Sequence, residues 1–166
     1  MTTYTARPVD PAALAELRAV DDAGRPCVPY TATEGGSPLR CCLRPCAAGE
    51  RIALVSYAPL RRWAAETGAA PGAYDEQGPV FIHAEECAGP AEDPRAYPFD
   101  RPGALRTLRR YDSAGRIVGG RLLAIPARAT EGFDEAFAEA FADPVVELVH
   151  VRAVEYGCFQ FEVRRA

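Results

Sequence analysis

The chain has 166 residues, of which 48% are hydrophobic and 25% charged, proportions typical of one globular domain rather than of a disordered protein. The formal net charge is −4, and all nineteen basic residues are arginine. An acidic balance argues against a nucleic-acid binder, and no apolar run approaches the ~20 residues of a membrane span. We therefore expect a single domain over residues 1–166, acting neither on nucleic acid nor in a membrane.

The chain contains six cysteines, at positions 27, 41, 42, 46, 87 and 158. Its first twenty residues include Asp10, Glu16 and Arg18 and lack the continuous apolar segment of a secretion signal. We therefore expect a cytoplasmic protein whose thiols stay reduced. A chain of this length can build a core without disulfides or metal, so the default prediction is no cofactor, with most cysteines acting as small buried hydrophobes.

The first half of the chain predicts a helix followed by two strands. Asp10 can cap the helix, Pro11 suits its first turn, and apolar residues recur at helical spacing. That apolar stripe consists of Ala13, Leu14, Leu17 and Val20. Residues 51–57 have apolar side chains on both faces, as in an interior strand. Residues 80–85 form the second predicted strand, and the intervening segment suggests a short helix ended by Gly68.

Residues 88–103 contain four prolines and cannot form regular structure. A long irregular segment inside a compact domain is more often functional than idle. We therefore expect this segment to cover a site.

The second half predicts a hairpin, a helix and a final hairpin. Strands at 104–112 and 116–125 flank a short turn that contains Gly115. Phe133, Phe137 and Phe141 recur at helical spacing within residues 130–143 and indicate a core-facing helix. Antiparallel pairs with helices to one side predict an α+β fold, with one mainly antiparallel sheet and two to three helices.

The last hairpin can be read in more detail. A three-residue loop at 155–157 places Gly157 at the left-handed position of a bulged turn. This register puts the apolar residues Val149, Val151, Ala153, Phe159, Phe161 and Val163 on one face. The opposite face receives His150, Arg152, Cys158, Gln160 and Glu162. A two-residue loop would place His150 and Arg152 among the phenylalanines, at the cost of burying charge.

Four segments carry a resemblance to a known family: "PLRCCLRPCAAGERIALVSYAP", "GPVFIHAE", "LRRYDSAGRIVGGR" and "VHVRAVEYGCFQFEVRR". In this order, over residues 38–165, they resemble a bacterial family called domain of unknown function 1203. The resemblance implies a small intracellular bacterial protein and no particular activity. Family members often have Cys where this chain has Leu39, and His where it has Arg152. The resemblance therefore assigns no shared metal or nucleophile to those two positions.

Metal binding is one chemical alternative. Cys42 and Cys46 are four residues apart, as are His83 and Cys87. Two such pairs could complete a tetrahedral zinc site, although neither pair has the tighter Cys-x-x-Cys spacing. The competing interpretation is that Cys42 fills the core and that Cys87 ends a strand.

The second alternative uses the polar face of the last hairpin. Cys158 shares that face with His150 and Arg152, which could activate its thiol. Glu162 lies opposite His150, and alternation places His83 and Glu85 on one face of their own strand. If this face is functional, His150 and Cys158 should be reachable from solvent, and a pocket that holds both histidines would favour that interpretation. The competing interpretation is an ordinary hydrogen-bonded sheet histidine.

Two functional hypotheses remain open. In the first, the domain binds a small anionic molecule or acts on it as an enzyme. His83, His150 and Cys158 would be the catalytic candidates, and Glu85, Arg152 and Glu162 the ligand-binding candidates. In the second, the same polar face belongs to a non-catalytic interaction or structural module. The second hypothesis gains from the absence of any established catalytic motif.

Overall fold

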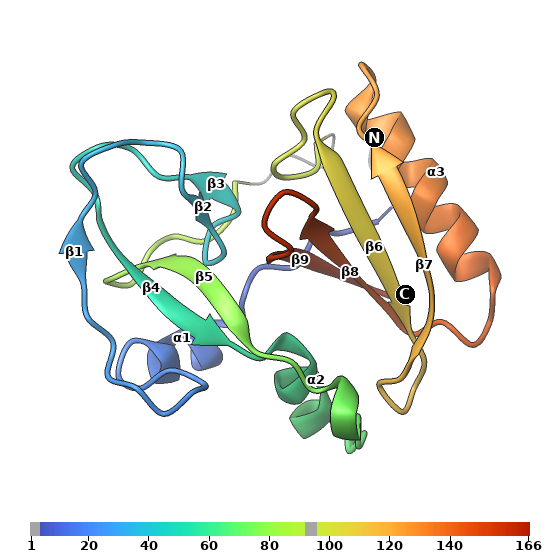
Figure 1. The fold of residues 1–166 in the computed structure, drawn as a ribbon, viewed down its shortest axis with the longest axis horizontal. Coiled ribbons are helices and arrows are strands. Elements are labelled where there is room, and N and C mark those ends of the chain that lie inside the picture. The colour runs from blue at the N-terminus through green and yellow to red at the C-terminus, as the bar shows by residue number, and fades with distance from the viewer. Residues whose placement is uncertain (1–3, 92–95) are drawn as a thin grey trace.

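The computed structural model describes residues 4–91 and 96–166, and its α+β architecture confirms the predicted fold class. The strands form two sheets that lie side by side, rather than the one sheet that the pattern predicted (Figure 1). The first sheet is built from residues before position 84, and the second from residues after position 104. The molecule therefore has a junction between two sheets, which the predicted single sheet did not include.

The first sheet has five strands in the order β1-β4-β5-β2-β3. They are β1 (Tyr30–Thr31), β2 (Pro38–Leu39), β3 (Arg44–Pro45), β4 (Arg51–Tyr57) and β5 (Gly78–His83). β4 matches the predicted strand, whereas β5 begins and ends two residues before its predicted bounds. All neighbours pair antiparallel except β2 and β5, which run parallel with Leu39 opposite Phe81. Parallel pairing brings the ends of β2 and β5 to the same edge.

Helix α1 (Pro11–Leu17) packs against the first sheet. The Asp10 side chain caps it by accepting a hydrogen bond from the backbone of Ala12, as predicted. Leu14 and Leu17 are buried in one cluster with Ile52, Val80 and Ile82. Val20 lies beyond the helix and is half exposed, so the predicted stripe is one residue too long.

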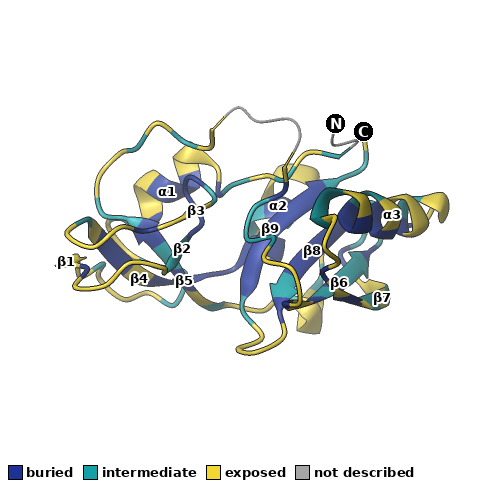
Figure 2. Cartoon of the chain, turned by 90° about the horizontal axis from the view of Figure 1, so that it is seen from above, coloured by how far each residue is buried: buried dark blue, intermediate teal, exposed yellow. Residues whose placement is uncertain are grey.

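The second sheet has four antiparallel strands in the order β7-β6-β8-β9. They are β6 (Leu105–Tyr111), β7 (Ile117–Ala124), β8 (Leu148–Ala153) and β9 (Phe159–Arg164). Helix α3 (Ala129–Ala142) covers one face, where Phe133 and Phe137 pack with Val149, Val151 and Phe161. Buried residues lie on the strands beneath α3, while much of β7 is exposed (Figure 2). The predicted phenylalanine stripe is therefore core, although Phe141 is only partly buried.

Helix α2 (Pro59–Thr67) ends at Gly68, whose φ of +78° is the left-handed conformation that glycine favours. A single 3-10 turn, η1 (Gly72–Tyr74), follows. Trp63 of α2 packs with Tyr111 and Leu148 of the second sheet. The segment between β4 and β5 thus leaves the first sheet, and its helix α2 packs against the second sheet.

The N-terminal segment also joins the two sheets. The backbone N–H of Arg7 donates to the carbonyl of Glu162 on β9 at 2.7 Å. Two residues later, the N–H of Val9 donates to the carbonyl of Arg40 beside β2 at 3.0 Å. This short segment therefore connects β9 with the end of β2 through backbone hydrogen bonds.

The last hairpin corrects part of the predicted register. The pairs Val151 with Phe161 and His150 with Glu162 are as expected, and Gly157 has a φ of +72°. The loop is one residue longer than predicted, because the backbone N–H of Ala153 donates to the carbonyl of Cys158 at 2.9 Å and leaves residues 154–157 between them. A bulge then pairs Arg152 with Phe159 instead of Gln160. The extra residue turns Phe159 away from Phe161 toward His150, and Gln160 is buried rather than solvent-facing.

Within the 88–103 segment, Tyr97 and Phe99 pack on the α3 side of the second sheet. Tyr97 is buried against Phe133 and Phe161, and the carbonyl of Phe99 accepts a hydrogen bond from Arg106. Residues 92–95 are outside the described part, and the predicted cover falls partly on them. Among the residues the structure describes, no helix is long and apolar enough to cross a membrane.

Candidate functional site

The residues predicted to share a site lie in three places. His83 ends β5 in the first sheet, and the next residue but one, Glu85, is an exposed partner of Arg51 at 3.1 Å. His150 and Glu162 are buried in the second sheet. Cys158 and Arg152 lie at the junction of the two sheets. The two histidines therefore do not share a pocket, because their strands belong to different sheets.

His150 is a buried structural histidine in this arrangement. Only 1% of its surface is exposed, which contradicts the expected access from solvent. Its Nε2 lies 2.7 Å from Oε2 of Glu162, and its ring packs between Tyr111 and Phe159. The bulge that turns Phe159 onto this face is the physical reason, since the ring covers the imidazole.

Glu162 is held as a buried carboxylate. Burial by itself would raise the pKa of Glu162, but the hydrogen bond from His150 and the charge of Arg164 outweigh it. The pKa of this carboxyl group is therefore below its ordinary value. Nε of Arg164 donates to Oε1 at 2.6 Å, so both carboxylate oxygens have partners. This pair belongs to the core and is not free to bind a ligand.

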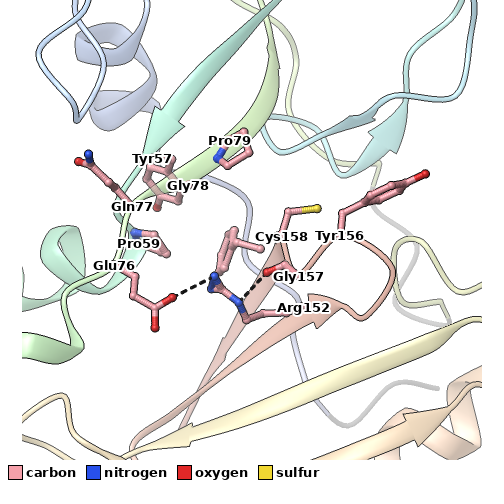
Figure 3. Close-up of a pocket in the computed structure, with 11 residues that line it drawn as sticks. Tyr57, Pro59, Glu76, Gln77, Gly78, Pro79, Arg152, Tyr156, Gly157 and Cys158 are labelled. Carbon is pink, nitrogen blue, oxygen red and sulfur yellow. Dashed lines mark hydrogen bonds and ion pairs between the residues drawn. The ribbon is translucent and has the colours of Figure 1, made fainter.

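A pocket of about 210 Å³ opens at the junction of the sheets (Figure 3). Tyr57 and Pro79 line it from the first sheet, and Arg152 and Cys158 line it from the last hairpin. Arg152 lies across its floor, where its Nε donates to the carbonyl of Gly157 at 3.0 Å and its Nη2 lies 3.4 Å from Glu76 (Figure 3). The pocket lining therefore combines a thiol, a guanidinium, the Glu76 carboxylate and an aromatic wall.

The charges of three arginines act on the Cys158 thiol. Arg40 is 1% exposed and makes a hydrogen bond with Cys158, and the charges of Arg106 and Arg152 also act on it. Burial lowers the pKa of the Arg40 guanidinium to about 10, which leaves it charged at neutral pH. Nε of Arg40 donates to the carbonyl of Phe159 at 2.7 Å, and Nη1 donates to that of Pro38. Among the described residues, no carboxylate pairs with Arg40.

Arginines outnumber carboxylates in the charged network that reaches the pocket, whose own lining contains Arg152 and Glu76. Arg109 and Arg152 share the carboxylate of Glu76, at 2.7 and 3.4 Å. Arg106 lies 3.6 Å from the half-exposed Glu155. With Arg40, four arginines thus face two carboxylates. Burial lowers the pKa of Arg152, and the neighbouring charge of Arg109 lowers it further, which is the signature of crowded cations.

A second cluster lies at the end of the first sheet. One ligand atom from each of Cys41, Cys42, His83 and Cys87 lies within 4.8 Å of the others. Because β2 runs parallel to β5, the turn after β2 emerges beside the end of β5, where His83 stands. Three of the four residues predicted for a zinc site are therefore present, and Cys41 takes the place of Cys46.

Local geometry explains that exchange. Residues 40–43 form the turn between β2 and β3, so Cys41 and Cys42 both stay at the sheet edge. Leu43 closes the turn with a φ of +55°, a costly conformation for a side chain of this kind. β3 then carries the chain away, and the Cys46 thiol faces the carbonyl of Glu34 at 3.7 Å.

Charged groups flank the imidazole of His83. Nε2 of His83 lies 3.0 Å from Oε2 of Glu50, whose other oxygen accepts from Arg44 at 2.9 Å. The hydrogen bond from Arg44 is the main cause that lowers the pKa of Glu50 to about 2. Within the cluster, the hydrogen bond between Cys41 and Cys42 raises the pKa of Cys41 and lowers that of Cys42.

A protein-family model described as "Protein of unknown function (DUF1203)" matches residues 36–165. The chain belongs to the DUF1203 family. The match includes both clusters and begins after α1 and β1. Searches of the curated proteins and of the solved structures gave no match.

Several residues of the two candidate sites in this DUF1203 chain could not be found from the sequence. Arg40 and Arg106 are distant from Cys158 in sequence, and no local pattern marks an arginine as buried. Glu50 precedes a strand and resembles an ordinary surface carboxylate. The signal that could have helped was the adjacent pair Cys41-Cys42, because the pairing of β2 with β5 carries both to His83.

Proposed function

We propose that this DUF1203 protein binds a small anionic molecule, a carboxylate or a phosphate monoester, in the pocket at Cys158. The observation that carries the proposal is the group of three buried or half-buried arginines around a thiol at the pocket. A pocket of about 210 Å³ suits a molecule of few atoms.

The charge balance supports an anion. The whole chain has a net charge of −4, yet four arginines face two carboxylates at this junction. Arg40 is the strongest case, because a buried guanidinium is ordinarily paired with an acid, and here its partners are carbonyls and a thiol. A bound anion would compensate the excess charge.

Arg152 is the residue best placed to contact the anion. It lines the pocket, and its guanidinium lies 3.4 Å from Glu76. An oxygen of the bound anion could replace this long contact with the Glu76 carboxylate. A guanidinium fits carboxylate and phosphate oxygens in a two-pronged arrangement. The bound anion would then lie beside Cys158, which lines the same pocket.

A reduced thiol is part of this proposal, and a reducing compartment such as the cytoplasm suits it. His83, His150, Glu85 and Glu162 have no role in it, because none of them lines the pocket. The chemistry therefore depends on arginine and cysteine rather than on a histidine base.

Thermal unfolding with a matched pair of compounds tests the proposal. Glycerol 3-phosphate should raise the melting temperature, and glycerol at the same concentration should not. A ligand at 100 times its Kd stabilises a protein by about 2.7 kcal/mol. Arg152→Gln should abolish the shift, while Arg116→Gln, which removes the same charge from an exposed hairpin turn, should retain it.

Equal shifts in both variants would mean that the anion binds elsewhere. No shift with glycerol 3-phosphate, inorganic phosphate or a panel of small carboxylates would contradict the proposal. That result would favour the alternative of a non-catalytic interaction or structural module, in which the junction only holds the two sheets together.

A further inference from the structure

We propose that Cys41, Cys42, His83 and Cys87 form a tetrahedral zinc site. The site lies at the end of the first sheet, shares no residue with the Cys158 pocket, and stands or falls independently of anion binding there. It would hold a divalent ion through three thiolates and one imidazole nitrogen.

The distances fit a zinc ion. In a tetrahedron with Zn–S bonds of about 2.3 Å and Zn–N bonds of about 2.0–2.1 Å, ligand atoms lie roughly 3.5–3.8 Å apart. Nδ1 of His83 lies 3.4 Å from Sγ of Cys41 and 3.8 Å from Sγ of Cys42. All four ligand atoms lie within 4.8 Å of one another, so a small contraction would complete the coordination.

The imidazole is oriented for metal binding. Nε2 of His83 points at the Glu50 carboxylate, 3.0 Å away, and a carboxylate accepts a hydrogen bond. With the ring proton on Nε2, the lone pair of Nδ1 is directed at the sulfurs. A carboxylate behind a metal-bound histidine is a common outer-shell arrangement. Arg44 fixes that carboxylate through its own bond to Glu50 at 2.9 Å.

The backbone supports the same assignment. The N–H of His83 donates to Sγ of Cys41 at 3.2 Å, which would stabilise a metal-bound thiolate. Cys41 and Cys42 are buried, whereas His83 and Cys87 are partly exposed, so an ion can reach the site from the loop side. The strained Leu43 holds the two neighbouring thiols in one turn.

The donor set selects the metal. Thiolates and imidazole suit Zn²⁺, while the oxygen ligands that Mg²⁺ and Ca²⁺ require are absent from the four. Four protein ligands leave no open position for substrate, so the ion would be structural. It would tie the β2–β3 turn to β5 and to the loop that begins the 88–103 segment.

Metal content and cobalt spectroscopy test the site in the full chain. Protein purified in reductant and reconstituted with Zn²⁺ should hold one zinc ion per chain. Replacement by Co²⁺ should give the strong visible bands of tetrahedral cobalt with thiolate charge transfer in the near ultraviolet. Cys42→Ser and Cys87→Ser should lose both signals. The control is Cys46→Ser, which removes a buried thiol from the same half of the molecule and should keep them.

A second variant keeps the test valid if the serine variants fail to fold. Glu50→Gln retains all four ligands and should weaken zinc binding 10- to 100-fold in competition with a chelating indicator. Less than half an equivalent of zinc in wild type, octahedral cobalt spectra, or equal zinc loss in Cys46→Ser would overturn the proposal. So would a count of four free thiols in the unfolded, zinc-free protein, since it would reveal a disulfide in place of the metal.

Discussion

Nε of Arg40 donates a 2.7 Å hydrogen bond to the carbonyl of Phe159, although 119 residues separate the two in sequence. Arg40 begins the turn that contains Cys41 and Cys42, and Phe159 begins β9. The same guanidinium contacts Cys158 at the pocket. One buried side chain thus connects the cysteine cluster of the first sheet with the pocket at the edge of the second.

Arg40→Met should destabilise the protein by about 2–4 kcal/mol. The substitution keeps an apolar stem but leaves the carbonyls of Phe159 and Pro38 without their donor, and an unsatisfied buried acceptor costs about 1–3 kcal/mol. Urea unfolding measures the change. Arg51→Met is the control, because its exposed pair with Glu85 is worth at most about 1 kcal/mol. Similar losses in both variants would show that the buried bridge contributes no more than a surface ion pair.

Cys158 should prefer the anionic reagent iodoacetate over neutral iodoacetamide more strongly than a small model thiol does. Small model thiols supply the reference ratio of the two rates, and the surrounding arginines should shift that ratio toward the anionic reagent. Arg152→Gln should reduce the preference, and Arg116→Gln should not. Mass spectrometry of the alkylated peptide gives both rates. If the ratio of the two rates in the wild-type protein equals that of the model thiols, the pocket is not electropositive.

Acid should destabilise the wild-type protein partly through Glu162. The pKa of its carboxyl group is lower in the folded protein than the ordinary value of 4.5. The folded state therefore binds this proton less readily than the unfolded chain does. The resulting stability is present above about pH 4.5 and is lost as pH falls through the folded pKa.

Glu162→Gln removes that titration. At neutral pH the variant should be less stable by about 3–5 kcal/mol, because His150 and Arg164 lose a buried partner. The difference between wild type and variant should shrink as the pH of the melting experiment falls below about 4.5. Glu131→Gln, at an exposed position on α3, is the control. A difference that stays constant with pH would show that Glu162 does not carry this linkage.

Chelation of the proposed zinc should loosen the first sheet and spare the second. The two sheets bury separate apolar clusters, and the four cysteine and histidine ligands belong to the first. Hydrogen exchange after treatment with a strong chelator in reductant should accelerate in residues 38–46 and 78–83. Residues 105–124 and 148–164 should keep their protection. Uniform loss of protection would mean that the two sheets unfold as one cooperative unit.

Phe161→Ala should cost about 3–5 kcal/mol, as large-to-small changes in a packed core do. Phe161 is fully buried against Phe133 and Tyr97 under α3. Leu122→Ala, on the exposed face of β7, should cost less than about 0.5 kcal/mol. Thermal or urea unfolding compares them. Equal costs would mean that α3 does not pack on this face of the sheet.

Local signals in the sequence were sufficient for most elements. The Asp10 cap, the Gly68 stop, the phenylalanine spacing in α3 and the turn at Gly115 each act within a few residues, so neighbouring side chains and backbone preferences decide them. The α+β class follows from the order of these elements. The predicted pairs of Val151 with Phe161 and of His150 with Glu162 were right only because the bulge at Gln160 offsets the one residue by which the loop is longer than predicted.

Only the tertiary structure decided which side chains meet. A single bulge turned Phe159 onto the imidazole of His150, and no local rule predicts an extra residue at that position. Parallel pairing of β2 with β5 brought Cys41 rather than Cys46 to His83. Arg40 reached Cys158 across the junction of two sheets. Sequence spacing sets local conformation, but contacts between distant segments depend on strand partners and on burial, which the whole chain settles together.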